Sequence, residues 1–143
     1  MDKRLYRVID ANLNRAREAI RVSEDTVRFI LDSAPLTREL KAIRHGIASL
    51  ITTMPNYKSE VIAMREASSD VGRSTSLSER KRRDCADIVV ANLERAKEAL
   101  RVLEEFFKLF DTKKAEGFKS LRYSLYAVEK KIAARMVALS RAR

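Results

Sequence analysis

The chain has 143 residues, of which 45% are hydrophobic and 35% are charged, but only three are glycine and two are proline. The hydrophobic fraction suffices for a folded core, whereas so few turn-formers exclude a β-sandwich or barrel, which turns about every 8–12 residues. The 30 Lys and Arg residues exceed the 20 Asp and Glu residues by ten charges, a surplus that favours anionic partners.

The rest of the composition narrows the partners and the compartment. Without Trp and with only 6% aromatic residues, the chain has few side chains for base stacking, so a nucleic-acid partner is disfavoured. The single cysteine, Cys85, excludes an intrachain disulfide and is typical of the reducing cytoplasm, where we expect the protein. The N-terminus lacks the apolar stretch of a signal peptide, and no apolar run approaches the roughly 18 residues of a membrane span, so we expect no membrane partner.

An internal repeat dominates the sequence. Residues 11–24 read ANLNRAREAIRVSE and residues 91–104 read ANLERAKEALRVLE, so ten of these fourteen positions are identical. A weaker match relates LKAIRHGIASL at 40–50 to FKSLRYSLYAV at 118–128. The repeat predicts one helical domain over 1–143, with halves at about 1–54 and 84–143 and a linker at 55–83.

Amphipathic spacing predicts four main helices. The first runs from about Asp2 to Leu31, and the second begins at an N-cap at Thr37 and stops before Pro55. A short helix is expected at about 59–64 in the linker. The third helix runs from about Asp84 to Phe110, and the fourth from about Lys114 to Leu139. Two such hairpins cannot bury their apolar stripes alone, so we expect an all-α four-helix bundle with a pseudo-two-fold axis and a long central loop.

The first and third helices each carry two apolar stripes. In the first helix the predicted core stripe comprises Ile9, Leu13, Ala16, Ile20, Ser23, Val27 and Ile30. The second, narrower stripe comprises Ala11, Val22 and Phe29, and it recurs in the third helix as Ala91, Val102 and Leu109. The long loop, a ligand or another subunit would have to cover this second stripe, and we expect a homodimer.

Polar and charged residues that repeat beside the second stripe are the first candidates for a site. They are Asn12, Arg15, Glu18, Arg21 and Glu24, with Asn92, Arg95, Glu98, Arg101 and Glu104 as their counterparts. Asn12 and Glu24 lie at the two margins of the core stripe. The charged members form either surface ion pairs, worth a few tenths of a kcal/mol, or an anion and metal site in which Arg holds phosphate and Glu holds Mg²⁺. The asparagines either bind ligand or bond to each other across the axis and fix the helix register.

Arginines of the second and fourth helices and one linker segment supply further candidates. Arg44 and Arg122 recur together and are candidates to bind phosphate. The linker segment REASSDVGR has no counterpart in the repeat, and within it Asp70 is a natural Mg²⁺ ligand. Arg65 and Arg73 would clamp phosphate, and Gly72 would let the backbone approach a ligand closely. In the alternative interpretation this segment merely turns or caps the chain before the third helix.

No P-loop, Rossmann, CxxC or HExxH motif is present, which disfavours the enzyme and zinc-module classes that these motifs mark. The blocks IDANLNRAREAIRVSED, LKAIRH, MREASSDVG, ANLERAKEALRVLEE and LRYSLYAVEK occur in this order. In these blocks the chain resembles the helical hydroxymethylpyrimidine-phosphate kinase family of thiamine biosynthesis, a domain often fused to the N-terminus of thiamine-phosphate synthase. The resemblance implies that ATP and Mg²⁺ are used to phosphorylate hydroxymethylpyrimidine phosphate to the diphosphate.

The candidate residues are then assigned to roles in that reaction. We expect Arg15, Glu18, Arg65, Asp70, Arg95 and Glu98 to be catalytic, with Asp70, Glu18 and Glu98 as metal ligands. We expect Asn12, Arg21, Arg44, Gly72, Arg73, Asn92, Arg101 and Arg122 to bind substrate or phosphate. Because duplicated sites diverge, one half of the repeat should be catalytic, and the sequence does not say which. Two alternatives stay open: a non-catalytic helical domain that docks on thiamine-phosphate synthase, and a basic protein that binds anions or nucleic acid through ERKRR at 79–83.

Overall fold

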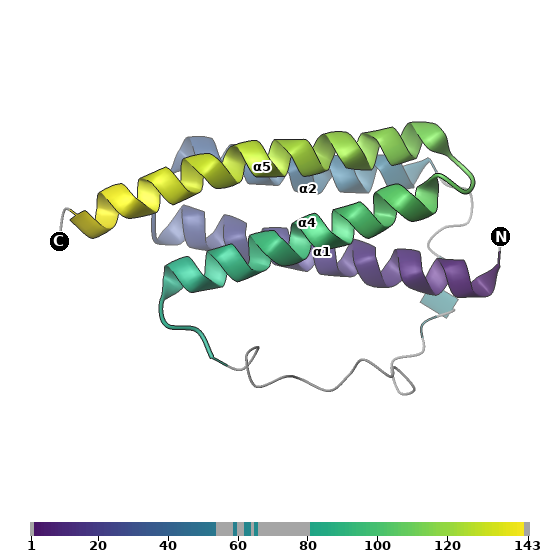
Figure 1. Cartoon of the computed structure of the whole chain (residues 1–143), viewed down its shortest axis with the longest axis horizontal. Helices are drawn as coiled ribbons and strands as arrows, with labels where there is room; N and C mark the ends of the chain where they lie inside the picture. The colour runs from purple at the N-terminus through teal and green to yellow at the C-terminus, as the bar shows by residue number, and fades with distance from the viewer. Residues whose placement is uncertain (1, 54–58, 60–61, 64, 66–80, 142–143) are drawn as a thin grey trace.

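Four helices account for most of the chain in the computed structural model, which describes residues 2–53, 59, 62–63, 65 and 81–141 (Figure 1). The helices are α1 (Lys3–Phe29), α2 (Ala34–Thr52), α4 (Cys85–Phe107) and α5 (Thr112–Arg141). They form two antiparallel hairpins, α1–α2 and α4–α5, which pack into a bundle. The all-α four-helix bundle is therefore confirmed. The short helix expected at 59–64 lies mostly outside the described residues, although positions 59, 62 and 63 are helical.

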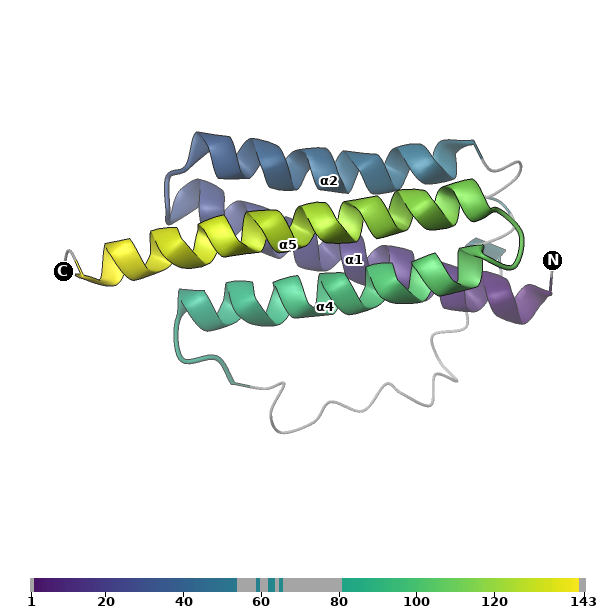
Figure 2. The same ribbon diagram turned by 45° about the horizontal axis from the view of Figure 1, so that its top comes forward.

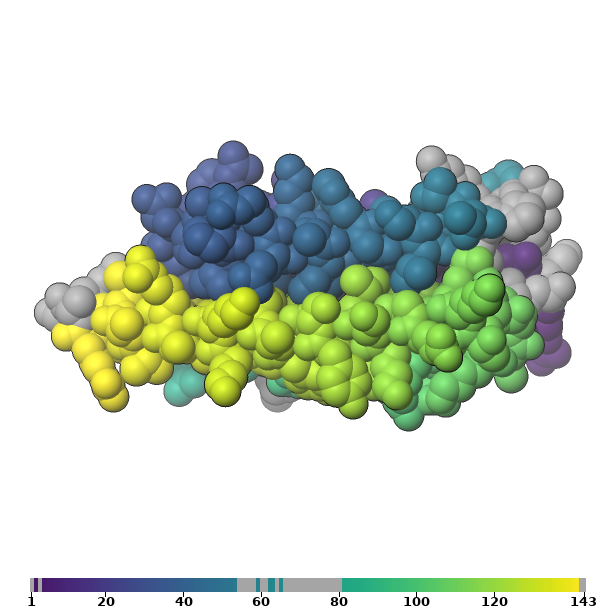
Figure 3. All heavy atoms as spheres, turned by 90° about the horizontal axis from the view of Figure 1, so that it is seen from above, coloured from purple at the N-terminus to yellow at the C-terminus, as the bar shows by residue number. Residues whose placement is uncertain are grey.

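Each helix of the first hairpin lies antiparallel to its repeat counterpart in the second. The α1–α4 contact is the most extensive in the bundle, and the α2–α5 contact closes the opposite side (Figure 2). From above, α2 and α5 meet along most of the length of α2 (Figure 3). This is the arrangement that a two-fold axis between the hairpins produces. Among the described residues, no helix is both long enough and apolar enough to cross a membrane.

The helix ends differ from the predicted boundaries at the α1–α2 turn. Thr37 is not the N-cap of α2, because the helix begins at Ala34 and Ser33 occupies the capping position. Pro35 lies in the first turn of α2, where its missing N–H has no intrahelical partner to lose. Before the turn, α1 ends at Phe29 rather than Leu31, and Asp32 has a φ of 47°. The sequence thus placed the turn correctly, but the proline starts the next helix instead of delaying it.

The predicted core is largely correct. The third-helix stripe is entirely buried, and it comprises Val89, Leu93, Ala96, Leu100, Leu103 and Phe107. The prediction that Ile30 belongs to the core is wrong, since its exposed fraction is 48%, whereas that of Leu31 is 5%. The reason is that α1 has already ended at Phe29 and the turn directs the side chain of Leu31 inward. Phe118 was not predicted, but it is fully buried and its ring lies 4.9 Å from that of Phe107. The outer stripe is exposed at Phe29 and Leu109, and the homodimer expected to cover it stays a prediction.

Small residues determine how closely the hairpins approach. Ala16 and Ala96, which are repeat partners, are both fully buried. On the opposite side of the bundle, a Cβ atom added to Gly46 would lie 2.7 Å from Cδ2 of Leu121. Larger side chains at these positions would therefore push the hairpins apart.

Ala16→Leu tests this constraint. We expect it to lower the free energy of unfolding by about 1–3 kcal/mol, since three extra carbons must enter a closed core. Ala42→Leu is the matched control at an exposed position of α2, and it should change stability by less than about 0.5 kcal/mol. Chemical denaturation of both variants is the measurement, and equal stabilities would contradict close packing at Ala16.

Candidate functional site

A buried carboxylate with two arginine partners joins the helices of the first hairpin. Glu24 on α1 has an exposed fraction of only 3%. Arg44 on α2 donates from Nε to its Oε2 at 2.9 Å and from Nη2 to its Oε1 at 3.4 Å. Arg21, half-exposed on α1, reaches Oε1 at 3.4 Å. Arg44 therefore has a carboxylate partner inside the bundle, and the phosphate role expected for Arg21 and Arg44 stays a prediction.

The second hairpin repeats this cluster. Glu104 on α4 is also 3% exposed, and Nη2 of Arg122 on α5 donates to its Oε2 at 2.8 Å. Arg101 donates to Oε1 at 2.7 Å. The hydrogen bond to Glu104 raises the pKa of Arg122 above its already high ordinary value. We call these two groups the Glu–Arg clamps: Glu24 with Arg21 and Arg44, and Glu104 with Arg101 and Arg122.

The paired asparagines bond within their own helices. Nδ2 of Asn12 donates to the carbonyl oxygen of Val8 at 2.8 Å, and Nδ2 of Asn92 donates to that of Ile88 at the same distance. The interpretation in which the two asparagines bond to each other across the axis is therefore wrong. Their expected role in binding ligand stays a prediction.

The exposed charged residues lie beside the seam between α1 and α4. Because Glu24 meets Arg44, it marks the side of α1 that faces α2, and the buried Ala19 on the other edge of the stripe faces α4. Arg15 precedes Ala19 by four residues, which rotates it about 40° further toward solvent. Arg95 bears the same relation to the buried Ala99 on α4. Both arginines therefore border the outer side of one seam.

The ion-pair interpretation of these rows holds only in part. Arg15 and Glu18 are both exposed, and neither forms an ion pair with another described residue. Arg21 does form pairs, with Glu24 and with Asp25 at 3.6 Å. The outermost members of the first row thus keep their charges available, whereas the member nearer α2 is used in a clamp.

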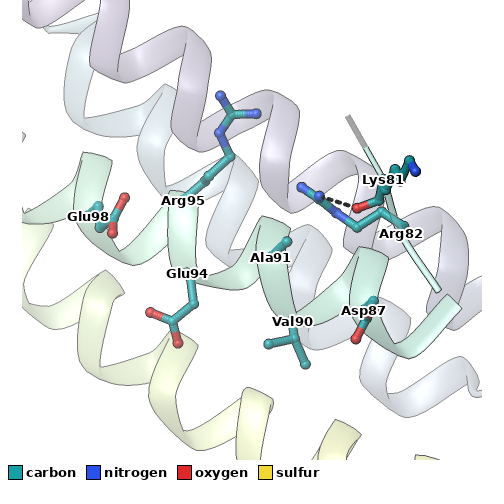
Figure 4. A pocket seen from close by; sticks show the side chains of 8 residues that line it. All are labelled: Lys81, Arg82, Asp87, Val90, Ala91, Glu94, Arg95 and Glu98. Carbon is teal, nitrogen blue, oxygen red and sulfur yellow. Dashed lines mark hydrogen bonds between the residues drawn. The ribbon is translucent and has the colours of Figure 1, made fainter. Parts of the chain in front are cut away.

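Arg95 and Glu98 lie in a surface hollow of about 460 Å³, which we call the α4 hollow (Figure 4). It is lined by Lys81, Arg82, Asp87, Val90, Ala91, Glu94, Arg95 and Glu98. In Figure 4 the guanidinium of Arg95 extends toward α1, while the carboxylate of Glu94 points toward α5. Lys81 and Arg82 were not assigned to the site from the sequence, although their basic cluster was visible there.

The three carboxylates of the α4 hollow are not equivalent. Arg83 donates to both oxygens of Asp87, at 2.7 and 2.8 Å, and this bond lowers the pKa of Asp87 to about 2. Glu94 is held by Lys97, which also donates to Glu129 at 2.7 Å. Glu98 forms no ion pair with a described residue. It is therefore the carboxylate of the hollow that remains available to a ligand.

Lys97 keeps its charge although it is buried between α4 and α5. Burial lowers the pKa of Lys97, but the hydrogen bonds from its ammonium to Glu129 and Glu94 outweigh that effect, and the net pKa is raised. Its Nζ also lies 5.2 Å from the centre of the Tyr126 ring. This cation therefore stays with its carboxylates and fixes one wall of the α4 hollow through Glu94.

The linker contributes one described contact with α1. Arg65 donates from Nε to Oδ2 of Asp10 at 2.6 Å and from Nη2 to Oδ1 at 2.9 Å. Asp10 is buried, and the sequence offered no sign of this partner, which lies 55 positions away. The other expected linker residues, Asp70, Gly72 and Arg73, lie outside the described residues. Among the residues that are described, no three His, Cys, Asp or Glu side chains gather as a metal site.

The Glu–Arg clamps generate a stability prediction. Arg44→Ala leaves Glu24 buried with only the single 3.4 Å bond from the half-exposed Arg21, and we expect a loss of about 3 kcal/mol in the free energy of unfolding. Arg21→Ala, the matched control at a half-exposed position, should cost no more than about 1 kcal/mol. Thermal or chemical denaturation distinguishes the two, and equal losses would show that the Arg44 bond is not what compensates the buried charge.

Comparison with known proteins places the chain in a family. Residues 7–131 match the ThiD2 family. The chain is 42% identical over 126 residues to the thiamine-phosphate synthase of Synechocystis sp., and the matched region covers 87% of this chain and 35% of the relative. It is 35% identical over 137 residues to the synthase of Rhodopirellula baltica, covering 95% and 36% of the two chains. The chain thus spans about a third of the length of these curated relatives, and no solved structure matches it significantly. This helical bundle belongs to the ThiD2 family, and it is homologous to one region of thiamine-phosphate synthases.

Proposed function

We propose that the chain is a kinase of thiamine biosynthesis that converts hydroxymethylpyrimidine phosphate to the diphosphate with ATP and Mg²⁺. An oxygen of the acceptor phosphate attacks the γ-phosphorus of ATP, the bond from that phosphorus to the β–γ bridging oxygen breaks, and ADP leaves. The acceptor oxygen is already anionic, so no general base is needed. The protein must align two mutually repelling polyanions and neutralise their charge.

The observation that carries this proposal is the composition of the α4 hollow. Lys81, Arg82 and Arg95 bring three cations to one surface depression that also holds Glu98. Its volume of about 460 Å³ lies in the ordinary range for a small-molecule site. Arginine forks suit phosphate oxygens, and they position and neutralise the transferring group. Thiamine biosynthesis is the context that the named relatives supply.

Mg²⁺ fits this site only if a carboxylate of the protein and the phosphates of the substrates bind the ion together. Mg²⁺ is usually held by one or two carboxylates together with substrate phosphates, so a preformed cluster is unnecessary. Glu98, without an ion-pair partner among the described residues, meets that need in the α4 hollow, and the exposed Glu18 of α1 is proposed as a further ligand from the sequence. When bound, the metal would neutralise phosphate charge. Asp70 is proposed as a further ligand from the sequence alone.

Arg95→Ala tests which half of the repeat is catalytic. The hollow places Arg95 with Lys81 and Arg82, so we expect kcat/KM to fall at least about tenfold further than in Arg15→Ala, or about 1.4 kcal/mol at the transition state. The measurement is turnover of the pyrimidine monophosphate with ATP and Mg²⁺. Arg135→Ala, at an exposed position of α5 and without an ion pair among the described residues, serves as the control and should retain full activity. Small and equal effects of Arg15→Ala and Arg95→Ala would reject a catalytic role for this hollow.

Asp70→Asn tests the expected linker ligand. The change preserves size and most capping ability but removes the charge that a metal needs. Activity should fall about a hundredfold or more, or about 2.7 kcal/mol at the transition state, with little change in melting temperature. If Asp70 only caps the chain, activity persists and the loss appears as about 0.5–2 kcal/mol of stability.

A second candidate function is a non-catalytic domain that docks on thiamine-phosphate synthase. The observation that favours it is the length relation: relatives named thiamine-phosphate synthase contain this region as only 35–36% of their chains. The same assay separates the two functions. Turnover by this chain supports the kinase, whereas no turnover together with stable co-purification of a synthase supports docking.

A further inference from the structure

A second hollow lies at the α1–α2 turn and shares no lining residue with the α4 hollow. Its volume is about 350 Å³. We call it the α1–α2 hollow, and it is lined by Glu24, Arg28, Asp32, Ala34, Thr37, Arg38 and Lys41. Helix α2 begins at this hollow, and Ser33 makes no side-chain cap bond there, so the positive end of the helix dipole adds to the charge of the lining.

Three cations of this hollow have no carboxylate partner. Arg28, Arg38 and Lys41 are all exposed, and none of them forms an ion pair with another described residue. Glu24 does not neutralise them, because its oxygens already accept from Arg44 and from the neighbouring arginine of the clamp. The hollow therefore keeps a net positive charge even with one further carboxylate, Asp32, in its lining.

This charge is only partly inherited from the repeat. By the two sequence offsets of the repeat, Arg38 corresponds to Glu116 in the second half. Arg28 corresponds to Lys108, which is bound to Glu105 at 2.8 Å. The second hairpin thus replaces one cation of the set by an anion and pairs another. Lys41 recurs as Lys119, but only the first hairpin has, at the positions of Arg28 and Arg38, cations that form no ion pair with a described residue, so their contribution is a property of that half.

We propose that the α1–α2 hollow is a second anion site, which binds a phosphate-bearing small molecule. Its volume suits a phosphorylated metabolite or a diphosphate. Two guanidinium groups and an ammonium from two helices supply the donors and the positive charge that phosphate oxygens require. The lining offers only Ala34 as an apolar side chain, so the phosphate group rather than an aromatic ring supplies the recognition. This site is independent of the proposed kinase activity and would equally serve a docking domain.

Titration of the isotope-labelled chain with inorganic diphosphate, followed by NMR, tests the proposal. We expect saturable shifts of the backbone amides of Thr37, Arg38 and Lys41. Arg38→Glu, which copies the second half, should weaken binding at least about tenfold. Lys119→Glu makes the same charge change on α5 and should weaken it less than about threefold, by long-range electrostatics alone.

A further variant should move affinity in the opposite direction. Asp32→Asn removes the remaining carboxylate, and Asn tolerates the positive φ of 47°, so diphosphate should bind about threefold more tightly. Arg95→Ala should leave these amide shifts unchanged, which separates this site from the α4 hollow. A parallel titration with a nucleoside monophosphate shows whether the hollow prefers a phosphate ester or free diphosphate, because the preferred anion binds with the lower Kd. The proposal fails if neither anion gives saturable shifts here, if Arg38→Glu and Lys119→Glu weaken binding equally, or if Arg95→Ala abolishes the shifts.

Discussion

Burial of the glutamate that repeats in both hairpins is the constraint that fixes how the two helices of each hairpin meet. Glu24 and Glu104 are almost completely withdrawn from water, and an ionised carboxylate in such a place must be hydrogen-bonded to cations. Arg44 and Arg122 supply those bonds from the second helix of each hairpin, so each clamp also fixes how its two helices meet. Outside the clamps, some charges are paired as well, as in the bonds of Arg65 to Asp10 and of Lys97 to Glu129, whereas Glu18 and Glu98 form no ion pair with a described residue.

The duplicated scaffold explains the shape of the molecule, but its chemistry depends on departures from the duplication. In the second half, the described end of the linker brings Lys81 and Arg82 to the outer face of α4, beside Arg95. In the first half, Arg38 stands where the other hairpin has Glu116, and it leaves a basic hollow at the turn. Two equal hairpins therefore support two unequal anion-attracting surfaces.

The sequence predicted what depends on periodicity and missed what depends on tertiary pairing. Helix number, hairpin order and the stripe through Leu93 and Leu100 follow from apolar spacing, which burial in a bundle enforces. The start of α2 was predicted too late, at an N-cap at Thr37. Pro35 is compatible with the first turn of a helix, so α2 begins already at Ala34. The bond from Arg44 to Glu24 spans 20 positions and crosses between helices, and no spacing rule within one helix reveals it.

The sequence could predict residues of the candidate site only at positions that are identical in the two halves of the repeat and have no role in the core. Arg95 and Glu98 were singled out on that ground, and the structure brings both into the α4 hollow. The same criterion also selected Arg101 and Arg122, which the structure pairs with the buried Glu104. Repetition at the edge of a core thus identifies residues under physical constraint, but it does not separate a constraint imposed by a ligand from one imposed by a buried charge. That distinction requires the partner of each side chain: Glu104 has two arginines, whereas Glu98 has no ion-pair partner among the described residues.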